Sequence, residues 1–275
     1  MDIKYYKSSD GCKIAYRFWP AGTPAKNIFI YIHGIESHSG WFENTARLLA
    51  ANGRSVYAPD RRGSGLSEGP RGDLSSYKEI LADIRCLIRI IKDETPGTGI
   101  FLIGLSLGAS IIINYALEYP DEAAGLVLMS PAIETLINVP FFMKLDIFIS
   151  KILNPRKRFP IPITADMFSD SREVQEYIRK DELKINSVTA SFYLELLRMK
   201  IIHYSKADKL KIPVLILLAE RDRIIDNKAV VEWAERLNAG REIKVIKNAC
   251  HSLQLETIEH ENEIIQDILS WAESK

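Results

Sequence analysis

Short apolar runs alternate with longer segments of helical periodicity along most of the 275-residue chain. The apolar runs predict strands at 27–33, 54–59, 100–104, 124–130, 214–219 and 242–246, after an opening hairpin of 2–6 and 13–19. Helical patterns follow at 41–52, 75–93, 107–119, 228–237 and 261–272. This alternation predicts an α/β fold, a mostly parallel eight-stranded sheet with helices on both faces.

The alternation stops between residues 131 and 210. Helical patterns occur near 140–153, 171–183 and 187–206, and no strand is expected among them. We therefore predict a core domain formed by residues 1–130 and 211–275, and a helical cap inserted at 131–210, hereafter the insertion. Insertions at this point of an open α/β sheet usually lie at or beside the carboxyl ends of the strands, where ligands bind.

The charge balance and the cysteine content argue against several kinds of partner and site. The chain carries 36 basic and 36 acidic residues, and this balance argues against a nucleic-acid partner. Cys12, Cys86 and Cys250 form no closely spaced pair, so neither a disulfide framework nor a zinc site is expected. The polar N-terminus and the lack of a long apolar run predict a cytoplasmic protein without a membrane span.

The strongest chemical signal is Gly104-Leu105-Ser106-Leu107-Gly108, which fits the pattern G-x-S-x-G. It lies between the strand predicted at 100–104 and the helix predicted at 107–119, as a nucleophile elbow requires. The two glycines allow the tight turn that exposes the serine hydroxyl. A glycine-rich turn with an incidental serine is the alternative, and the strand and helix on either side favour Ser106 as a nucleophile.

A serine nucleophile needs a base and an acid that orients the base. His251 follows the last predicted strand and reaches the same sheet edge as Ser106, so we predict that it is the base. Glu220, Asp222 and Asp226 all follow the strand at 214–219. We choose Asp222 as the acid, because Asp226 directly precedes a helix and suits an N-cap.

Acyl transfer also needs donors for the oxyanion. The backbone N–H of Leu107, next to the nucleophile, is one candidate. The backbone N–H of Ile35, in the loop after the strand at 27–33, is the other. His33 ends that strand and is interpreted as holding the loop together, and Gly34 permits close approach of the backbone. No metal ion and no organic cofactor is required.

With these residues in hand, the chain resembles the α/β-hydrolases of the monoacylglycerol lipase/lysophospholipase group, which is of the serine aminopeptidase S33 type. Residues 33–53 resemble the segment HG-x-x-E-H-S-x-R-[YF] of the group, 59–72 resemble D-x-R-G-H-G-x-S-x-G, and 217–226 resemble its acid loop. Leu105, Ser64 and Trp41 depart from residues usual in the group. The resemblance implies an α/β-hydrolase fold and a monoacylglycerol or lysophospholipid-like substrate.

The insertion begins with an apolar segment at 136–153, in which Phe141, Leu145 and Phe148 share one helical face. Packing within the cap is one interpretation of this face. The other is a lid that lines an acyl tunnel and makes transient contact with membrane or micelle surfaces. We predict a substrate pocket formed by the following side chains: His38, Trp41, Leu105, Phe141, Leu145 and Phe148.

The sequence thus predicts a serine carboxylester hydrolase that acts on a small-molecule or lipid-like ester, with no obligate protein partner. A peptidase or amidase of the proline-iminopeptidase type would use the same triad, and so would a short-chain or aryl esterase. An acidic site for a substrate amine would favour the peptidase. A binding protein with the hydrolase fold is a third class, which the complete set of Ser106, Asp222 and His251 disfavours.

Overall fold

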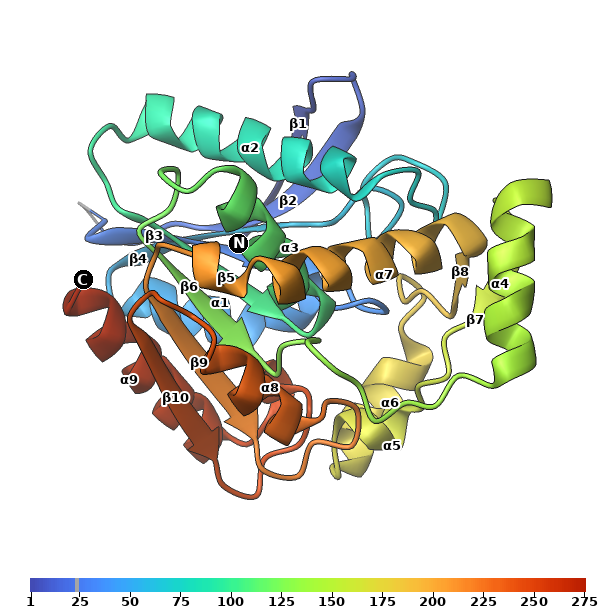
Figure 1. Ribbon diagram of the computed structural model, residues 1–275. Helices are drawn as coiled ribbons and strands as arrows, with labels where there is room; N and C mark the ends of the chain where they lie inside the picture. The colour runs from blue at the N-terminus through green and yellow to red at the C-terminus, as the bar shows by residue number, and fades with distance from the viewer. Residues whose placement is uncertain (23–24) are drawn as a thin grey trace.

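A computed structural model of the protein describes residues 1–22 and 25–275. At its centre lies an eight-stranded sheet with the order β1-β2-β4-β3-β5-β6-β9-β10 (Figure 1). Strand β2 pairs antiparallel with β1 and with β4, and the strands from β4 to β10 pair in parallel. The strands are β1 Asp2–Lys7, β2 Lys13–Trp19, β3 Asn27–Ile32, β4 Arg54–Pro59, β5 Ile100–Leu105, β6 Gly125–Met129, β9 Val214–Ala219 and β10 Arg241–Ile246. The predicted mostly parallel sheet is confirmed.

Alternate residues of the central strands face two separate cores. On β3, Ile28 and Ile30 pack with helices α2, α3 and α8, whereas Phe29 and Tyr31 pack with α1 and α9. Because both faces are covered, these strands are apolar throughout rather than alternating. The helices are α1 Glu43–Ala51, α2 Tyr77–Glu94, α3 Leu107–Glu118, α8 Asn227–Ala234 and α9 Ile258–Glu273.

The insertion contains four helices and a small two-stranded sheet in the described structure. Their bounds are α4 Phe141–Leu153, β7 Arg158–Pro160, α5 Ala165–Phe168, α6 Arg172–Lys180, β8 Ser187–Thr189 and α7 Ala190–Ser205. β7 pairs antiparallel with β8, and buried Phe159 lies opposite buried Val188. The expectation that this segment has no strand was wrong, because three-residue strands are too short to show an alternating pattern.

Several helix boundaries differ from the sequence prediction for local reasons. The helix predicted at 41–52 opens with a 3₁₀ turn, Ser39–Phe42, before α1 begins. The helix predicted at 187–206 begins at Ala190, because the Thr189 hydroxyl accepts the N–H of Phe192 as an N-cap. Two further 3₁₀ turns span Ala207–Lys209 and Leu253–Leu255.

The end of the insertion near β8 is tied to the loop that follows β4. The N–H of Thr189 donates to the carbonyl of Gly72 at 3.0 Å, and its hydroxyl donates to Asp73 at 2.7 Å. The guanidinium of Arg158 donates to the carbonyl of Arg71 at 2.7 Å. These contacts hold the start of α7 against the core domain.

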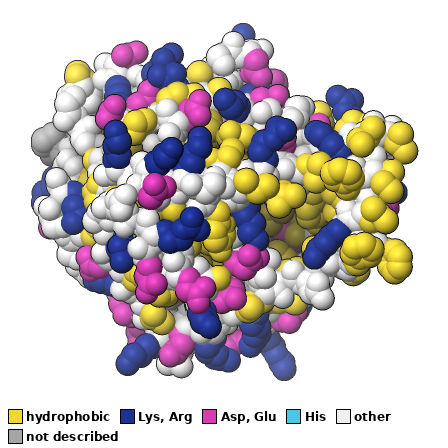
Figure 2. Space-filling view, in the orientation of Figure 1, with side chains coloured by type: hydrophobic (Ala, Val, Ile, Leu, Met, Phe, Trp, Pro, Cys, Tyr) yellow, Lys and Arg dark blue, Asp and Glu magenta, His cyan; other side chains and the backbone are white. Residues whose placement is uncertain are grey.

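Helix α4 lies at the outer edge of the molecule, beyond β7 and α7 (Figure 1). It contributes Ile147 to a small buried cluster with Phe159 and Ala190. Most of its other apolar side chains are exposed, and Figure 2 shows apolar side chains gathered on this side of the molecule. The exposed residues of α4 are Phe141, Phe142, Leu145, Phe148, Ile149, Ile152 and Leu153. No helix among the described residues combines the length and apolarity needed to span a bilayer.

Candidate active site

Ser106 occupies a strained turn between β5 and α3. Its backbone has φ 53° and ψ −114°, a region that residues other than glycine rarely adopt. A Cβ atom at Gly104 would collide with the backbone at Ala109, and one at Gly108 would overlap the carbonyl oxygen of Ile32. The two glycines are therefore required for the close packing of the turn against β3 and the start of α3.

His251 and Asp222 are directly hydrogen bonded. Nδ1 of His251 lies 2.9 Å from Oδ2 and 3.1 Å from Oδ1 of Asp222, and both side chains are buried. Oδ1 also accepts the backbone N–H groups of Ile224 and Ile225. Burial opposes ionisation of Asp222, but His251 and these two N–H groups outweigh it and lower the pKa of the carboxyl below its usual value. Asp222 is thereby held as a carboxylate facing Nδ1.

The three residues predicted as a triad follow the carboxyl ends of three strands of the same sheet. Ser106 follows β5, Asp222 follows β9 and His251 lies in the loop after β10 (Figure 1). Phe168 of the insertion packs against the ring of His251, with the ring centroids 5.8 Å apart. Asp226 accepts the N–H groups at the start of α8, so its predicted role as an N-cap is confirmed.

The loop that carries Ile35 is braced by a buried histidine. Nδ1 of His33 donates to the carbonyl of Gly34 at 2.9 Å, and Nε2 accepts the N–H of Arg61 at 3.0 Å. Burial and the charge of Arg61 lower the pKa of His33 well below its ordinary value, so the ring stays neutral. The interpretation of His33 as a residue that holds this loop is confirmed.

Arg61 is a further positioning residue that the sequence analysis missed. Its Nη2 donates to the carbonyl oxygens of both Gly34 and Ile35 at 2.9 Å. Anchoring these carbonyls fixes the orientation of the adjoining peptide groups. The signal was present in the segment 59–72, which follows β4, because β4 pairs with β3 and so brings Arg61 beside the loop after β3.

The same loop is linked to the insertion through Glu36. Its buried carboxylate lies 3.0 Å from Nζ of Lys184, and its carbonyl accepts the N–H of Ile185 at 2.9 Å. Burial raises the pKa of Glu36 to about 7, and Lys184 opposes the shift. The oxyanion candidate Ile35 is thus held on one side by the core and on the other by the insertion.

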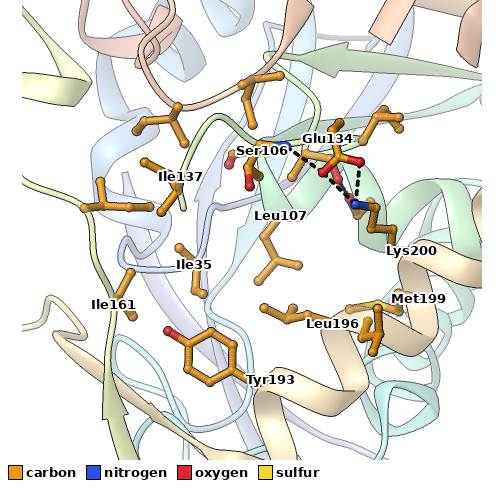
Figure 3. Close-up of a pocket in the computed structure, with 18 of the residues that line it drawn as sticks. Ile35, Ser106, Leu107, Glu134, Ile137, Ile161, Tyr193, Leu196, Met199 and Lys200 are labelled. Atoms are coloured by element: carbon orange, nitrogen blue, oxygen red, sulfur yellow. Dashed lines mark hydrogen bonds and ion pairs between the residues drawn. The ribbon is translucent and has the colours of Figure 1, made fainter. Parts of the chain in front are cut away.

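Ser106 opens into a cavity of about 210 Å³ between the core and the insertion (Figure 3). Ile35 and Leu107 line it beside the serine, and most of the remaining wall is aliphatic. α7 forms one side through Tyr193 and Leu196. The other aliphatic lining residues are Ala132, Ile133, Ile137, Val139, Ile161, Pro162, Ile163, Leu197, Met199, Ile224 and Ile225.

The structure does not place the predicted pocket residues of α4 along this cavity. Phe141, Leu145 and Phe148 have exposed fractions of 72%, 46% and 59% and are absent from the lining of the cavity. The helix packs through Ile147 instead. Segments 132–139 and 161–163 and helix α7 line the cavity in place of α4.

The other three predicted pocket residues also lie elsewhere. Nε2 of His38 and Nε1 of Trp41 both approach Oδ2 of Asp181, at 3.1 and 2.6 Å. They join the loop before α1 to the end of α6, which is a structural role. Leu105 is buried in the core shared with α1 and α9, because it ends β5 on the face opposite α3.

Residues 23–258 match the protein family described as "Serine aminopeptidase, S33". The chain belongs to this family. Among curated proteins, this S33 hydrolase is 29% identical to the monoglyceride lipase of Homo sapiens over 280 residues, covering 100% of this chain and 91% of the relative. The predicted membership of the α/β-hydrolases of the monoacylglycerol lipase group is confirmed.

Solved structures agree with the assignment. The S33 hydrolase resembles the monoacylglycerol lipase of Paleococcus ferrophilus with a TM-score of 0.84 and 25% identity, covering 98% of each chain. It also shares the fold of a soluble variant of the monoglyceride lipase of Saccharomyces cerevisiae, crystallised with a substrate analog, at a TM-score of 0.88 and 20% identity. That match covers 99% of this chain and 94% of the yeast chain. The protein is therefore a lipase-like hydrolase with the α/β-hydrolase fold.

Proposed function

We propose that the protein is a serine carboxylester hydrolase that cleaves a monoacylglycerol- or lysophospholipid-like ester. The observation that carries the proposal is Ser106, held in a strained turn where its hydroxyl opens into a largely aliphatic cavity. Such a cavity suits an acyl chain, and the strained turn suits a nucleophile. The monoglyceride lipases among its relatives support the same substrate class.

The proposed reaction begins when Oγ of Ser106 attacks the ester carbonyl and His251 takes its proton. Asp222, bonded to Nδ1–H, orients the ring and stabilises the imidazolium. The N–H groups of Leu107 and Ile35 hold the oxyanion of the tetrahedral intermediate. His251 then gives its proton to the leaving alcohol, and the C–O bond to the alcohol breaks. Water, deprotonated by His251, attacks the acyl-enzyme. The bond between the acyl carbon and Oγ of Ser106 then breaks, His251 returns the proton to Oγ, and the acid leaves.

The peptidase alternative requires a carboxylate that is free to bind a substrate amine. Among the described residues that line the cavity of Ser106, Glu134 is the acidic one, and it is paired with Lys200. A second cleft, beside Trp41, is rich in acidic side chains, but Ser106 does not line it. Its acidic lining residues are Glu43, Glu173, Glu256 and Glu261. This arrangement favours esters over peptides.

The test compares esters and amides on the same protein. p-Nitrophenyl esters with acyl chains from acetate to palmitate and aminoacyl p-nitroanilides would be assayed with wild type, Ser106→Ala and the exposed control Ser270→Ala. We expect ester turnover by wild type and the control, and a loss of at least about 10³-fold in Ser106→Ala. Turnover of anilides without esters would favour the peptidase, and full activity in Ser106→Ala would refute the triad.

We further propose that the insertion acts as a cap over the active site and that α4 provides its contact with lipid. The seven exposed apolar side chains of α4 form a face too large for an ordinary solvated helix. Lys144 lies on the same helix and could approach lipid head groups. Such a helix would rest in the interface rather than cross the bilayer, and the cavity opens on the same side of the molecule (Figure 2).

A further inference from the structure

The second cleft, beside Trp41, lies between the insertion and the core domain and has a volume of about 600 Å³. Helix α6 of the insertion forms one wall, and the other walls come from the start of α1, the 3₁₀ turn before it and the start of α9. Among the described residues that line it there are four glutamates and no lysine or arginine. Because the whole chain is electrically balanced, this excess of negative charge belongs to the cleft itself, hereafter the acidic cleft.

Two of the four carboxylates already have partners. Glu43 accepts two hydrogen bonds from Arg47, one turn further along α1, at 2.5 and 3.0 Å. Glu256 accepts the N–H of Cys250 at 2.7 Å and lies 3.1 Å from Nδ1 of His260. These contacts hold both side chains in fixed positions.

Glu261, at the start of α9, lacks such a partner. It is only 7% exposed, and its Oε1 accepts no hydrogen bond from the described residues. Burial alone raises the pKa of Glu261 above its ordinary value, since no nearby positive charge opposes the shift. A buried carboxylate without a donor or a counter-charge is unfavourable. The cleft therefore contains a carboxylate that a positively charged ligand would satisfy.

The rest of the lining suits a hydrocarbon chain. Val174 and Leu255 offer aliphatic surface, and the ring of Tyr177 is 46% exposed and lies 6.2 Å from that of Trp41. An exposed aromatic face attracts an ammonium group. The described residues contain no group of three acidic, histidine or cysteine side chains arranged to hold a metal ion. The lining thus fits ammonium groups spaced along a methylene chain better than it fits a bare metal ion.

The acidic cleft is separate from the substrate cavity but touches the loop that carries the proposed base. Ser106 does not line it. Glu256 accepts the N–H of the residue directly before His251. Trp41 packs edge-on against Phe168, with ring centroids 5.8 Å apart, and Phe168 packs in turn against His251. An occupant would therefore rest on residues that are one contact away from the catalytic histidine.

We propose that the acidic cleft binds an aliphatic diamine or polyamine, as a ligand distinct from the substrate. One ammonium group would pair with Glu261 and a second with Glu173 on the wall formed by α6, while the methylene groups between them lie against Val174 and Leu255. Because Glu173 belongs to the insertion and Glu261 to the core domain, the bound amine would tie the two together. The proposal does not depend on the proposed ester hydrolysis.

Calorimetric titration at physiological ionic strength tests the site, with spermidine as the probe. We expect one spermidine to bind per chain, and to bind Glu261→Gln and Glu173→Gln about tenfold more weakly, because each variant keeps the shape of the side chain and removes its charge. The matched controls Glu263→Gln and Glu176→Gln change exposed carboxylates of the same two helices that do not line the cleft. The controls and Ser106→Ala should bind spermidine as wild type does.

Three outcomes of the titration would overturn the proposal. The first is that wild type does not bind spermidine. The second is that the cleft variants and the controls bind equally, which would show a general attraction to surface charge. The third is that magnesium chloride displaces spermidine at constant ionic strength, which would show a metal site.

Hydrogen exchange of the wild type tests the link between the insertion and the core domain without any substitution. With spermidine bound, we expect the amide protons of α6 to exchange at least about threefold more slowly than without it. Magnesium chloride at the same ionic strength should leave their exchange unchanged. Unchanged exchange in α6 with spermidine bound would refute the proposed link.

Discussion

The protein should lose stability in mild acid, and replacing His203 with leucine should remove a large part of that loss. The imidazole is fully buried beside Trp233 and Tyr204, with ring centroids 6.3 and 5.8 Å away. Neither ring nitrogen has a partner among the described residues that would stabilise the imidazolium. The burial and the neighbouring Lys200 hold the pKa of His203 at about 3.

The size of the effect follows from the two pKa values. In the unfolded chain a histidine has a pKa of ~6.5. Between that value and about 3, the unfolded chain binds a proton that the folded chain excludes, so the free energy of unfolding falls as the pH falls. At ~1.4 kcal/mol for each pH unit, the loss between pH 7 and pH 4.5 is about 2.5 kcal/mol. Above pH 7 the ring is neutral in both states and contributes no pH dependence.

Urea unfolding followed by circular dichroism, at pH 7 and at pH 4.5, measures this contribution. Other titrating groups are common to wild type and His203→Leu, so they cancel in the difference between the two proteins. At pH 7 the difference reports only the change in packing. At pH 4.5 it should move in favour of the variant by about 2.5 kcal/mol. The same difference at both pH values would show that the folded protein protonates His203 and would refute the reasoning.

Four further variants test the site and the apolar face. Gly108→Ala places a methyl group against the carbonyl oxygen of Ile32. We expect the free energy of unfolding, measured with urea, to fall by about 2–4 kcal/mol, and the esterase activity to be lost. Arg61→Met removes the hydrogen bonds to the carbonyls of Gly34 and Ile35, and should lower kcat about 100-fold with little change in KM. Ser106→Gly should abolish turnover but raise the free energy of unfolding by about 1 kcal/mol, because it relieves the strained φ. Phe148→Ser should weaken binding to phosphatidylcholine vesicles about tenfold in a sedimentation assay and change stability by less than about 0.5 kcal/mol.

The sequence was most informative where one local rule decides the structure. Strand β3 reads as a continuous apolar run because both of its faces are buried, and the pattern around Ser106 requires a strand before it and a helix after it. The hydrogen bond between His251 and Asp222 joins residues that each follow a predicted strand. The order of strands in such a sheet then brings their loops to one edge.

Prediction was weakest where a side chain's role depends on a distant segment. Periodicity defines an apolar face but does not say what covers it, so the predicted pocket residues Phe141 and Phe148 prove to be exposed. Trp41 is predicted to form part of the substrate pocket, whereas its indole N–H donates to Asp181, 140 residues later in the chain. The cavity-lining position of Lys200 likewise depends on how α7 packs against the core, which its own sequence does not reveal.

The unequal attachment of α4 and α7 divides the insertion into two units of different local stability. α7 is held through Thr189 and Arg158 to the loop after β4. α4 is attached within the insertion, through the cluster around Ile147 and through hydrogen bonds from Lys151 to Ser191 and from Lys157 to Asp146. The free energy needed to detach α4 alone is therefore far below that of global unfolding. Movement of α4 would carry with it Ile137 and Val139, which precede the helix and line the cavity, while the wall formed by α7 stays in place. Amide protons of α4 should accordingly exchange with solvent at rates at which those of α7 remain protected.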